Sequence, residues 1–504
     1  YINIWRISKV FVIILKRGKK MEEIKTVMTK SGKKISFVYR PDPPRGGMKH
    51  TYFTPDRAYV VQFFNHSEME QNTLVQQRLE AILGKYNPTR SQEEGGAKGN
   101  EKKWANYFQK RFCWPVDIVV EPELGIVCPA YPKNFFFDKN ASDLLNLNGK
   151  DKKSTWYTQK HRRYLNESEL GDLKGLLEVS LMLAQSVRRM HQAGLAHSDL
   201  SCNNVLIDPK SGSCIIIDID SLVVPGIYPP DVIGTMGYIA PEVLACLSLP
   251  RGHRVAPSVY TDLHALPVLM YEYLFCRHPL QGKKIYDKQS ERKNEFLQMG
   301  EKALFVEHPV DDSNRPFEMP FTIKDMGQYL EQLFLRAFTE GLHCPEKRPT
   351  AMEWERGLFL TLDLLQMCPN AKCKQKWFVA KKEQNHCPFC GVKIERIPYL
   401  QSYRNIAQKQ GQWTFFREIH IFSGKILYDW HFYDNVSCNE KAEAVELAII
   451  IKRNGTWFLQ NKNIQGLYDG AGNFVPQHGF LEIKENTFFR AHMNEHDLLF
   501  HVAI

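Results

Sequence analysis

The stretch HSDLSCNNVLID, residues 197–208, places a histidine, an aspartate and an asparagine within one short loop. Asp199 is followed five residues later by Asn204, and a nearby apolar run, residues 214–217, ends at Asp218. Phosphoryl transfer needs a base that orients the acceptor hydroxyl and oxygen ligands that hold magnesium. The spacing therefore predicts a phosphoryl-transfer centre, with Asp199 facing the hydroxyl and with Asn204 and Asp218 as Mg²⁺ ligands.

Further landmarks follow this loop in a fixed order. The segment GTMGYIAPE, residues 234–242, precedes an apolar helix that opens with Asp262, and Arg348 lies later, in KRPT. Together with HSDLSCNN and the triplet DID at residues 218–220, this order resembles the protein kinase family, whose loop reads H-R-D-L-x-x-x-N and whose metal-binding triplet reads D-F-G. The resemblance implies a bilobal α+β fold and an ATP- and Mg²⁺-dependent transferase. It also pairs Arg348 with the glutamate of A-P-E.

Three positions depart from the kinase pattern. Ser198 stands where the family has the arginine that binds a phosphorylated activation loop, so we do not expect activity to depend on that switch. Ser201 stands where serine/threonine kinases have a lysine, which leaves the acceptor open between a protein and a small molecule. Gln62, in AYVVQFF (residues 58–64), stands where a lysine contacts the ATP phosphates, and glutamine supplies no positive charge.

Lys49 is the candidate replacement for this missing cation. It follows Gly46-Gly47, a partial glycine-rich loop, at the start of the preceding strand, from which its side chain can project into the same pocket. One known kinase group uses a lysine in this way. The alternatives are a surface lysine and an ordinary turn.

A glutamate on the helix expected over residues 67–83 would hold this lysine in a kinase. Glu80 is the candidate, and Glu68 and Glu70 compete with it. The residues that we expect to line the ATP site are Gly46, Gly47, Lys49, Gln62, Glu80, Asn204 and Asp218.

Four cysteines follow the helical region. CPNAKC (residues 368–373) and CPFCG (residues 387–391) form C-x4-C, a thirteen-residue spacer and C-x2-C. Each pair can hold one edge of a tetrahedral ion through a tight turn, which predicts a structural zinc ribbon. His386 could substitute for its neighbour, although adjacent ligands rarely fit one tetrahedron. The alternative is a group of buried thiols, and the expected ligands are Cys368, Cys373, Cys387 and Cys390.

The chain of 504 residues is long enough for several domains. We expect the N-lobe of a kinase over residues 21–132, the C-lobe over 133–367, the zinc ribbon over 368–397 and a β-rich domain over 398–504. The last region loosely resembles a forkhead-associated domain but lacks that family's phosphothreonine-binding signature, so we expect a degenerate binding module.

Residues 1–20 precede the first methionine, Met21, and their apolar run is too short to span a bilayer. We interpret them as a non-native extension, upstream sequence read in frame, with the natural start at Met21. The net charge of +10 is spread along the chain, so we expect neither nucleic acid nor membrane as a partner. Most of the twelve cysteines lie singly in apolar runs, which is typical of reduced thiols in the cytoplasm.

The combination of HSDLS-x-NN, IDIDS and a zinc ribbon resembles bacterial kinases encoded in tellurite-resistance-type stress operons. The resemblance covers about residues 35–400. It implies a cytoplasmic protein kinase that phosphorylates serine or threonine in bacterial stress signalling, with a von Willebrand A-domain protein and a phosphatase 2C-type enzyme as partners. The competing interpretation is a pseudokinase scaffold that binds nucleotide or partner proteins without phosphoryl transfer.

Overall fold

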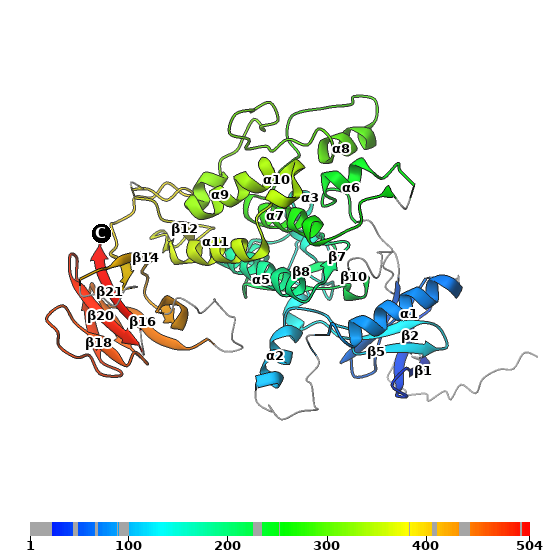
Figure 1. Cartoon of the computed structure of the whole chain (residues 1–504), viewed down its shortest axis with the longest axis horizontal. Helices are drawn as coiled ribbons and strands as arrows, with labels where there is room; N and C mark the ends of the chain where they lie inside the picture. Colours follow the sequence, from blue (N-terminus) through cyan, green and yellow to red (C-terminus); the bar gives the residue numbers. More distant parts are fainter. Residues whose placement is uncertain are drawn as a thin grey trace, which may run out of the picture.

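The structure, a computed structural model, arranges the chain as three parts in a row: a β-rich N-terminal lobe, a helical lobe and a set of C-terminal strands (Figure 1). The segment 1–20 and the pair Gly46-Gly47 lie outside the described residues. The structure describes residues 23–43, 49–65, 69–87, 89, 100–224, 234–250, 253–382, 384–405, 411–432, 444–493 and 496–504.

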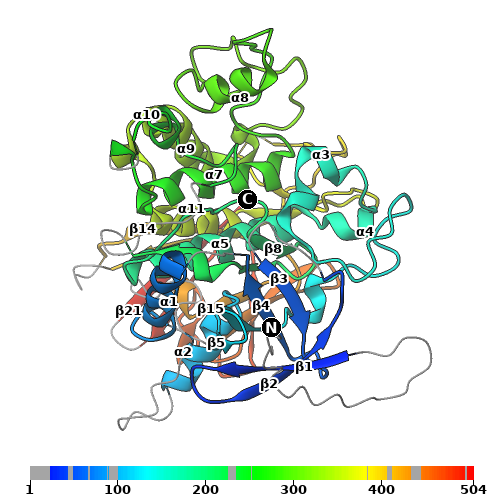
Figure 2. The same ribbon diagram turned by 90° about the vertical axis from the view of Figure 1, so that its right-hand side faces the viewer.

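The N-terminal lobe is one antiparallel sheet with the strand order β2-β1-β5-β6-β4-β3. Its two edge strands, β2 and β3, curl toward each other. The ring centroid of Tyr52 in β3 lies 5.1 Å from that of Phe37 and 5.8 Å from that of Tyr39, both in β2, and the Tyr52 and Tyr39 rings are stacked. Figure 2 looks onto this lobe. The strands are β1 (Glu23–Thr29), β2 (Lys34–Tyr39), β3 (Lys49–Phe53), β4 (Tyr59–Phe64), β5 (Asp117–Glu121) and β6 (Gly125–Pro129).

Strand β4 alternates between two small cores, as the period of two in a strand requires. Val61 and Phe63 face the inside of the curled sheet, whereas Val60 packs with Val75 and Leu79 of the helix that covers the other face. That helix, α1 (Met69–Leu83), confirms the helix expected over residues 67–83. Lys49 lies opposite Phe64, and Thr51 lies opposite Gln62. Lys49 and Gln62 therefore lie on the same face of the sheet, the face toward α1.

The helical lobe is built around α5 and α7, most of whose residues are buried. Helix α7 is apolar all round, as expected for a helix enclosed by others, and a capping box of Ser258 and Thr261 fixes its start. The helices are α3 (Gln159–Arg162), α4 (Glu167–Leu170), α5 (Leu173–Gln192), α6 (Pro241–Ala245), α7 (Val259–Phe275), α8 (Glu291–Met299), α9 (Gly327–Phe338), α10 (Glu340–His343) and α11 (Ala351–Asp363). The short strands are β7 (Ala196–His197), β8 (Val205–Asp208), β9 (Ser213–Ile216) and β10 (Leu222–Val223).

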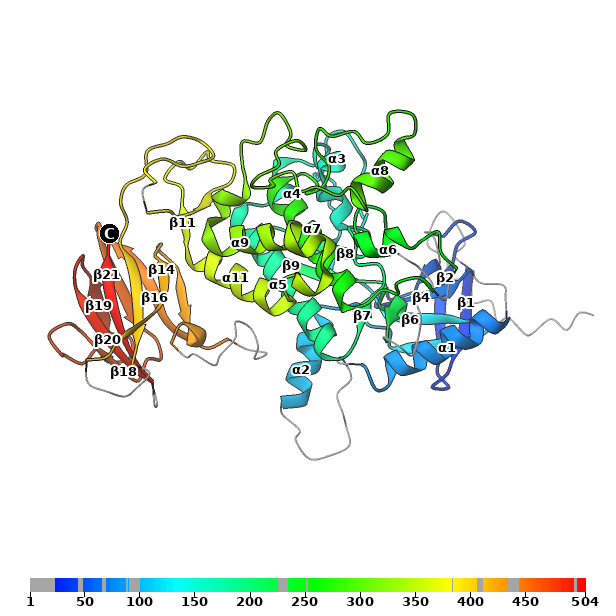
Figure 3. The same ribbon diagram turned by 45° about the horizontal axis from the view of Figure 1, so that its top comes forward.

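The C-terminal strands form two sheets that share one hydrophobic core. Figure 3 shows them at the end of the molecule opposite the N-terminal lobe. One sheet has the order β14-β13-β21-β20-β18 and the other β15-β16-β17-β19. The resemblance to a forkhead-associated domain stays a prediction. The strands are β13 (Tyr399–Arg404), β14 (Thr414–His420), β15 (Ile426–Tyr428), β16 (Glu446–Arg453), β17 (Thr456–Asn461), β18 (Gly466–Tyr468), β19 (Phe480–Ile483), β20 (Phe488–Met493) and β21 (His496–Ala503).

One segment differs from the expected loop. Residues 91–103 are polar and rich in glycine, which predicts a loop, but helix α2 begins within them and runs over Asn100–Gln109. Tyr107 and Ala105 are buried in this helix. The apolar residues that anchor α2 follow the charged stretch, so composition hides the start of the helix. No helix in the described part of the chain is long and apolar enough to cross a membrane.

The C-terminal strands are joined to the helical lobe by a buried carboxylate at the end of α11. Asp363 Oδ1 lies 3.0 Å from His431 Nε2 and 3.4 Å from Lys425 Nζ, and Oδ2 lies 3.3 Å from Arg417 Nη1. Burial alone would raise the pKa of Asp363, but these three partners, His431 first among them, hold it well below its usual range. The junction therefore depends on one negative charge.

Replacing Asp363 with alanine is expected to lower the free energy of unfolding by about 3–5 kcal/mol, because Lys425 and Arg417 would stay buried without a counter-charge. Urea unfolding, together with limited proteolysis near residue 398, measures the loss. The control is Glu346→Ala, which removes an exposed carboxylate of the same lobe. Equal stability of Asp363→Ala and the control would show that the junction does not depend on this charge.

Aromatic residues reinforce the same junction. Trp377 and Trp430, which follow the last helix in the sequence, both lie in the hydrophobic core of the helical lobe. Trp430 packs edge-on against Phe359 of α11 at 5.9 Å, and Trp377 packs against Phe422 at 4.7 Å. Strand β12 (Trp377–Val379) pairs with β11 (Leu365–Met367), which directly follows α11. The hydrophobic core of the helical lobe thus includes side chains that follow α11 in the sequence.

Candidate active site

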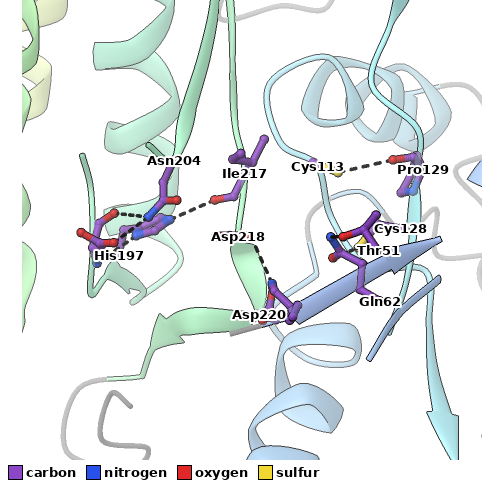
Figure 4. Close-up of polar contacts among 12 residues, drawn as sticks. Thr51, Gln62, Cys113, Cys128, Pro129, His197, Asn204, Ile217, Asp218 and Asp220 are labelled. Carbon is purple, nitrogen blue, oxygen red and sulfur yellow. Dashed lines mark hydrogen bonds and ion pairs between the residues drawn. The ribbon is translucent and has the colours of Figure 1, made fainter. Parts of the chain in front are cut away.

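The loop HSDLSCNN links strands β7 and β8, and Asp218 follows strand β9 of the adjacent hairpin. The amide nitrogen of Asn204 donates to the backbone oxygen of Asp199 at 2.7 Å and to its Oδ2 at 2.9 Å. The backbone N–H of Ile217 donates to the backbone oxygen of Asn204 at 2.9 Å. These bonds bring Asp199 and Asn204 together and place Asp218, the next residue after Ile217, beside them. Figure 4 shows His197 and Asn204 on one side of Asp218 and Gln62 on the other.

His197 and Asp262 hold this loop from the side of the helical lobe. His197 Nε2 donates to the backbone oxygen of Ile217 at 3.1 Å, while its Nδ1 accepts from the backbone N–H of Asp199 at 3.1 Å. The buried carboxylate of Asp262, on α7, accepts from the backbone N–H of His197 at 2.9 Å and from His191 at 3.0 Å. Each side chain fixes main-chain atoms, so the position of Asp199 is set by the core.

One oxygen of Asp199 has no hydrogen-bond donor among the described residues. Oδ2 is held by Asn204, whereas Oδ1 is buried and accepts no hydrogen bond from any residue that the structure describes. A buried carboxylate oxygen without a donor is costly, so a hydrogen-bond donor at this atom would be stabilising. The hydroxyl of an acceptor molecule would supply one.

Asp218 has an uncommon backbone conformation. Its φ of 58° and ψ of 40° are left-handed, which is unusual for a residue with a side chain. Burial would raise the pKa of its carboxyl, but the charge of Lys49 holds the pKa below its usual range. Its carboxylate and the amide oxygen of Asn204 are ligands of the kind that Mg²⁺ prefers, and the nitrogen of that amide is already engaged by Asp199.

The structure places Lys49 next to Asp218. Its Nζ lies 3.1 Å from Asp218 Oδ1 and 2.6 Å from Asp220 Oδ1. Burial would lower the pKa of Lys49, but the charges of Asp220 and Asp218 outweigh it and raise the pKa, so the amine is fully protonated. The alternative of a surface lysine is therefore wrong, because Lys49 is only 7% exposed.

Gln62, on the same sheet face as Lys49, contacts the two neighbouring strands. Its Nε2 donates to Thr51 Oγ1 at 3.1 Å, and its Oε1 lies 3.8 Å from Cys128 Sγ. The amide is thus used across three neighbouring strands and carries no charge. The positive charge next to Asp218 comes from Lys49, one strand away.

The expectation that Glu80 pairs with Lys49 is not met. The Glu80 carboxylate instead forms an ion pair with Lys30, in the turn that follows β1, and is largely exposed. On the same helix, Arg78 is buried, and its Nε donates to the backbone oxygen of Asp220 at 3.2 Å. Helix α1 therefore approaches the site through an arginine.

Asp220 is a site residue that the sequence analysis missed. It occupies the position of the glycine in D-F-G, where no charge is expected, yet it makes the shorter of the two contacts with Lys49. Two features of the sequence could have pointed to Asp220. The motif IDID contains a second aspartate, and no glutamate of the expected helix stands out as the partner of Lys49.

The end of the segment GTMGYIAPE is anchored to the helical lobe as the resemblance implies. Arg348 binds Glu242 through two nitrogens, at 2.8 Å and 2.7 Å, which confirms the predicted pair. Tyr238 donates a hydrogen bond to Glu272 of α7, and His278 Nε2 donates to the backbone oxygen of Gly237 at 2.9 Å.

Glu272 makes stability depend on pH. Burial raises its pKa from 4.5 to about 7, and the hydrogen bond from Tyr238 offsets only part of the shift. Between these values the unfolded chain has lost this proton while the folded chain keeps it. Raising the pH from 4.5 to 7 therefore removes about 3 kcal/mol of stability, and the loss is complete above pH 7.

The variant Glu272→Gln keeps an acceptor for Tyr238 and has no proton to lose. We expect its free energy of unfolding, relative to the native sequence, to rise between pH 5 and pH 7 and to stay constant above. Urea unfolding at pH 5, 7 and 8 measures this difference, with Glu346→Gln as the exposed control. A difference that does not change with pH would contradict the assignment.

The four cysteines of the expected ribbon converge. Their sulfur atoms all lie within 4.8 Å of one another, with Cys368 and Cys390 at 3.6 Å and Cys373 and Cys387 at 3.9 Å. A tetrahedron with Zn–S bonds of about 2.3 Å has edges of about 3.8 Å, so this donor set fits zinc. His386 is exposed and hydrogen-bonded to Asn385, away from this role.

The known proteins that this chain resembles are protein kinases. Residues 154–358 match the protein kinase domain family. Serine/threonine-protein kinase PSK2 of Saccharomyces cerevisiae is 31% identical over 127 residues, which cover 24% of this chain and 11% of that protein. Serine/threonine-protein kinase MRCK gamma of Mus musculus is 26% identical over 234 residues, which cover 40% of this chain and 14% of that protein. A rhoptry antigen kinase domain of Toxoplasma gondii is 14% identical, covers 69% of this chain and 88% of its own, and has a TM-score of 0.40.

This chain spans only about a tenth of the length of the curated relatives that it matches. The matched region contains Asp199, Asn204 and Asp218 as well as the Glu242–Arg348 pair, whereas Lys49 lies before it. Residues 154–358 thus match a protein kinase domain, and the relatives that this chain matches in sequence are serine/threonine kinases.

Proposed function

We propose that this chain is an active protein kinase that transfers phosphate from ATP to serine or threonine in the presence of Mg²⁺. The observation that carries the proposal is the position of Lys49. Its ammonium group lies 3.1 Å from Asp218, on the sheet face that also holds Gln62, so the positive charge lost at Gln62 is supplied from the neighbouring strand.

The residues divide the work by their chemistry. Asp199 orients the acceptor hydroxyl through Oδ1, the oxygen that Asn204 does not hold, and takes up the proton. Asn204 and Asp218 are the ligands for magnesium, and Lys49 binds phosphate oxygens. When bound, ATP would supply the transferable phosphoryl group, and Mg²⁺ would neutralise the charge on its phosphates. Gly46 and Gly47 are proposed to approach the phosphates with their backbone.

Two further parts of the proposal have narrower support. The four cysteines fit a structural zinc ion, which would hold the ribbon against the helical lobe. The resemblance of HSDLS-x-NN and IDIDS alone supports a cytoplasmic role in bacterial stress signalling of the tellurite-resistance type. It also supports partnership with a von Willebrand A-domain protein and a phosphatase 2C-type enzyme.

The test is phosphoryl transfer by the full chain from ATP labelled on its γ-phosphate, with Mg²⁺ and a broad panel of proteins. We expect label on serine or threonine, and we expect none with Asp218→Asn, which excludes a contaminating kinase. Nucleotide binding without transfer to any protein would favour a pseudokinase scaffold. Transfer to a metabolite but to no protein would favour a small-molecule kinase, the alternative raised by Ser201.

A further inference from the structure

We infer that Asp220 is the positioning residue for Lys49, in place of a glutamate on the helix. The inference rests on the proposed role of Lys49. Asp220 lies in the short helix η3 (Ile219–Ser221), directly after Asp218. Its Oδ1 is 2.6 Å from Lys49 Nζ, the closest contact of the amine that the structure describes.

The side chains of the two aspartates differ in their exposure to solvent. The side chain of Asp218 is 40% exposed, whereas those of Asp220 and Lys49 are 8% and 9% exposed. Asp218 can therefore turn its carboxylate to an incoming metal ion. Asp220 is enclosed together with the amine and stays as its counter-charge. A buried ammonium group without such a partner is strongly unfavourable.

Helix α1 contacts Asp220, and its glutamate Glu80 does not contact Lys49. Arg78 donates to the backbone oxygen of Asp220 at 3.2 Å, and Glu80 is occupied by Lys30. The helix thus holds the main chain of Asp220, and the side chain of Asp220 holds Lys49. A shift of α1 would therefore move the main chain of Asp220, and with it the position of Lys49.

Binding of a fluorescent ATP analogue with Mg²⁺ tests this role in a double-mutant cycle. We expect Asp220→Asn to weaken binding about ten-fold or more, because the amine loses its place at the phosphates. Lys49→Met should weaken it similarly. In the Lys49→Met background, Asp220→Asn should add no further loss, since it acts only through Lys49. Asp220→Glu should restore part of the affinity, and the exposed control Asp312→Asn should have no effect.

Several outcomes would overturn the inference. Equal losses from Asp220→Asn with and without Lys49 would show that the two residues act separately. A changed Mg²⁺ requirement that persists in Lys49→Met would make Asp220 a metal ligand. Tighter binding by Asp220→Asn would make the pair an inhibitory clamp.

Thermal melting of each variant separates these effects from unfolding. If Asp220→Asn does not fold, Asp220→Glu with and without Lys49→Met completes the cycle, and additive losses there would reject the role. Coupling in binding without phosphoryl transfer would reject the proposed function and leave this inference standing. Wild-type protein that binds no nucleotide would reject both.

Discussion

The variant Asp199→Asn is expected to lower kcat for phosphoryl transfer by about 10²–10⁴-fold. Asparagine keeps the shape of the side chain and an oxygen that can accept from Asn204, so the loop should remain folded. It loses the ability to take up the proton of the acceptor hydroxyl. The KM for ATP should stay within about two-fold, because the proposed role of Asp199 is at the acceptor hydroxyl and not at the nucleotide.

Steady-state kinetics on the best protein substrate measure both constants. Asp312→Asn, which alters an exposed aspartate of the helical lobe, is the matched control and should keep wild-type values. A kcat within ten-fold of wild type for Asp199→Asn would show that another group accepts the proton.

Loss of zinc is expected to unfold the ribbon. The hydrophobic cluster of the ribbon is small, and structural zinc contributes about 10–16 kcal/mol of binding free energy in small zinc modules. Purified protein should carry one zinc ion per chain. The double variant Cys368→Ser/Cys387→Ser, which removes one ligand from each pair, should carry none.

The damage should extend into the helical lobe. Phe389 of the ribbon contacts Phe321 at 4.7 Å between ring centroids, and Trp377 lies in the core of the lobe. We therefore expect the double variant to melt at a lower temperature, as measured by calorimetry alongside elemental analysis for zinc. The control Cys344→Ser removes a half-buried thiol outside the cluster and should retain its zinc. A full complement of zinc in the double variant would refute the site.

The parts of the site that the sequence predicts are those fixed by local spacing. Asp199 and Asn204 share one loop, and the strand pair β8–β9 carries Asp218 to its side, so the order of residues almost determines their contact. Lys49 could be predicted because side chains of neighbouring strands that face the same way share one pocket. The four cysteines could be predicted because their spacing matches the turns that hold a tetrahedral ion.

The remaining contacts depend on packing that local sequence does not record. Helix α1 carries several polar residues, and only its rotation against the sheet decides that Arg78 turns inward and Glu80 turns to Lys30. Asp220 aligns with the glycine of D-F-G, to which the resemblance assigns no charged role, so the resemblance offered no reason to include it in the site. The contacts of Asp363 join residues that are 54 to 68 positions apart, so no local pattern could predict them.

The junction at α11 sets where the chain can be cut for expression of a shorter protein. A fragment that stops at Met367, after the last helix, keeps strand β11 but removes its partner β12. It also removes Trp377 and Trp430 from the core and deprives Asp363 of its three partners. A fragment trimmed to the region that matches the kinase family would therefore have an incomplete hydrophobic core. The shortest autonomous unit extends at least through His431.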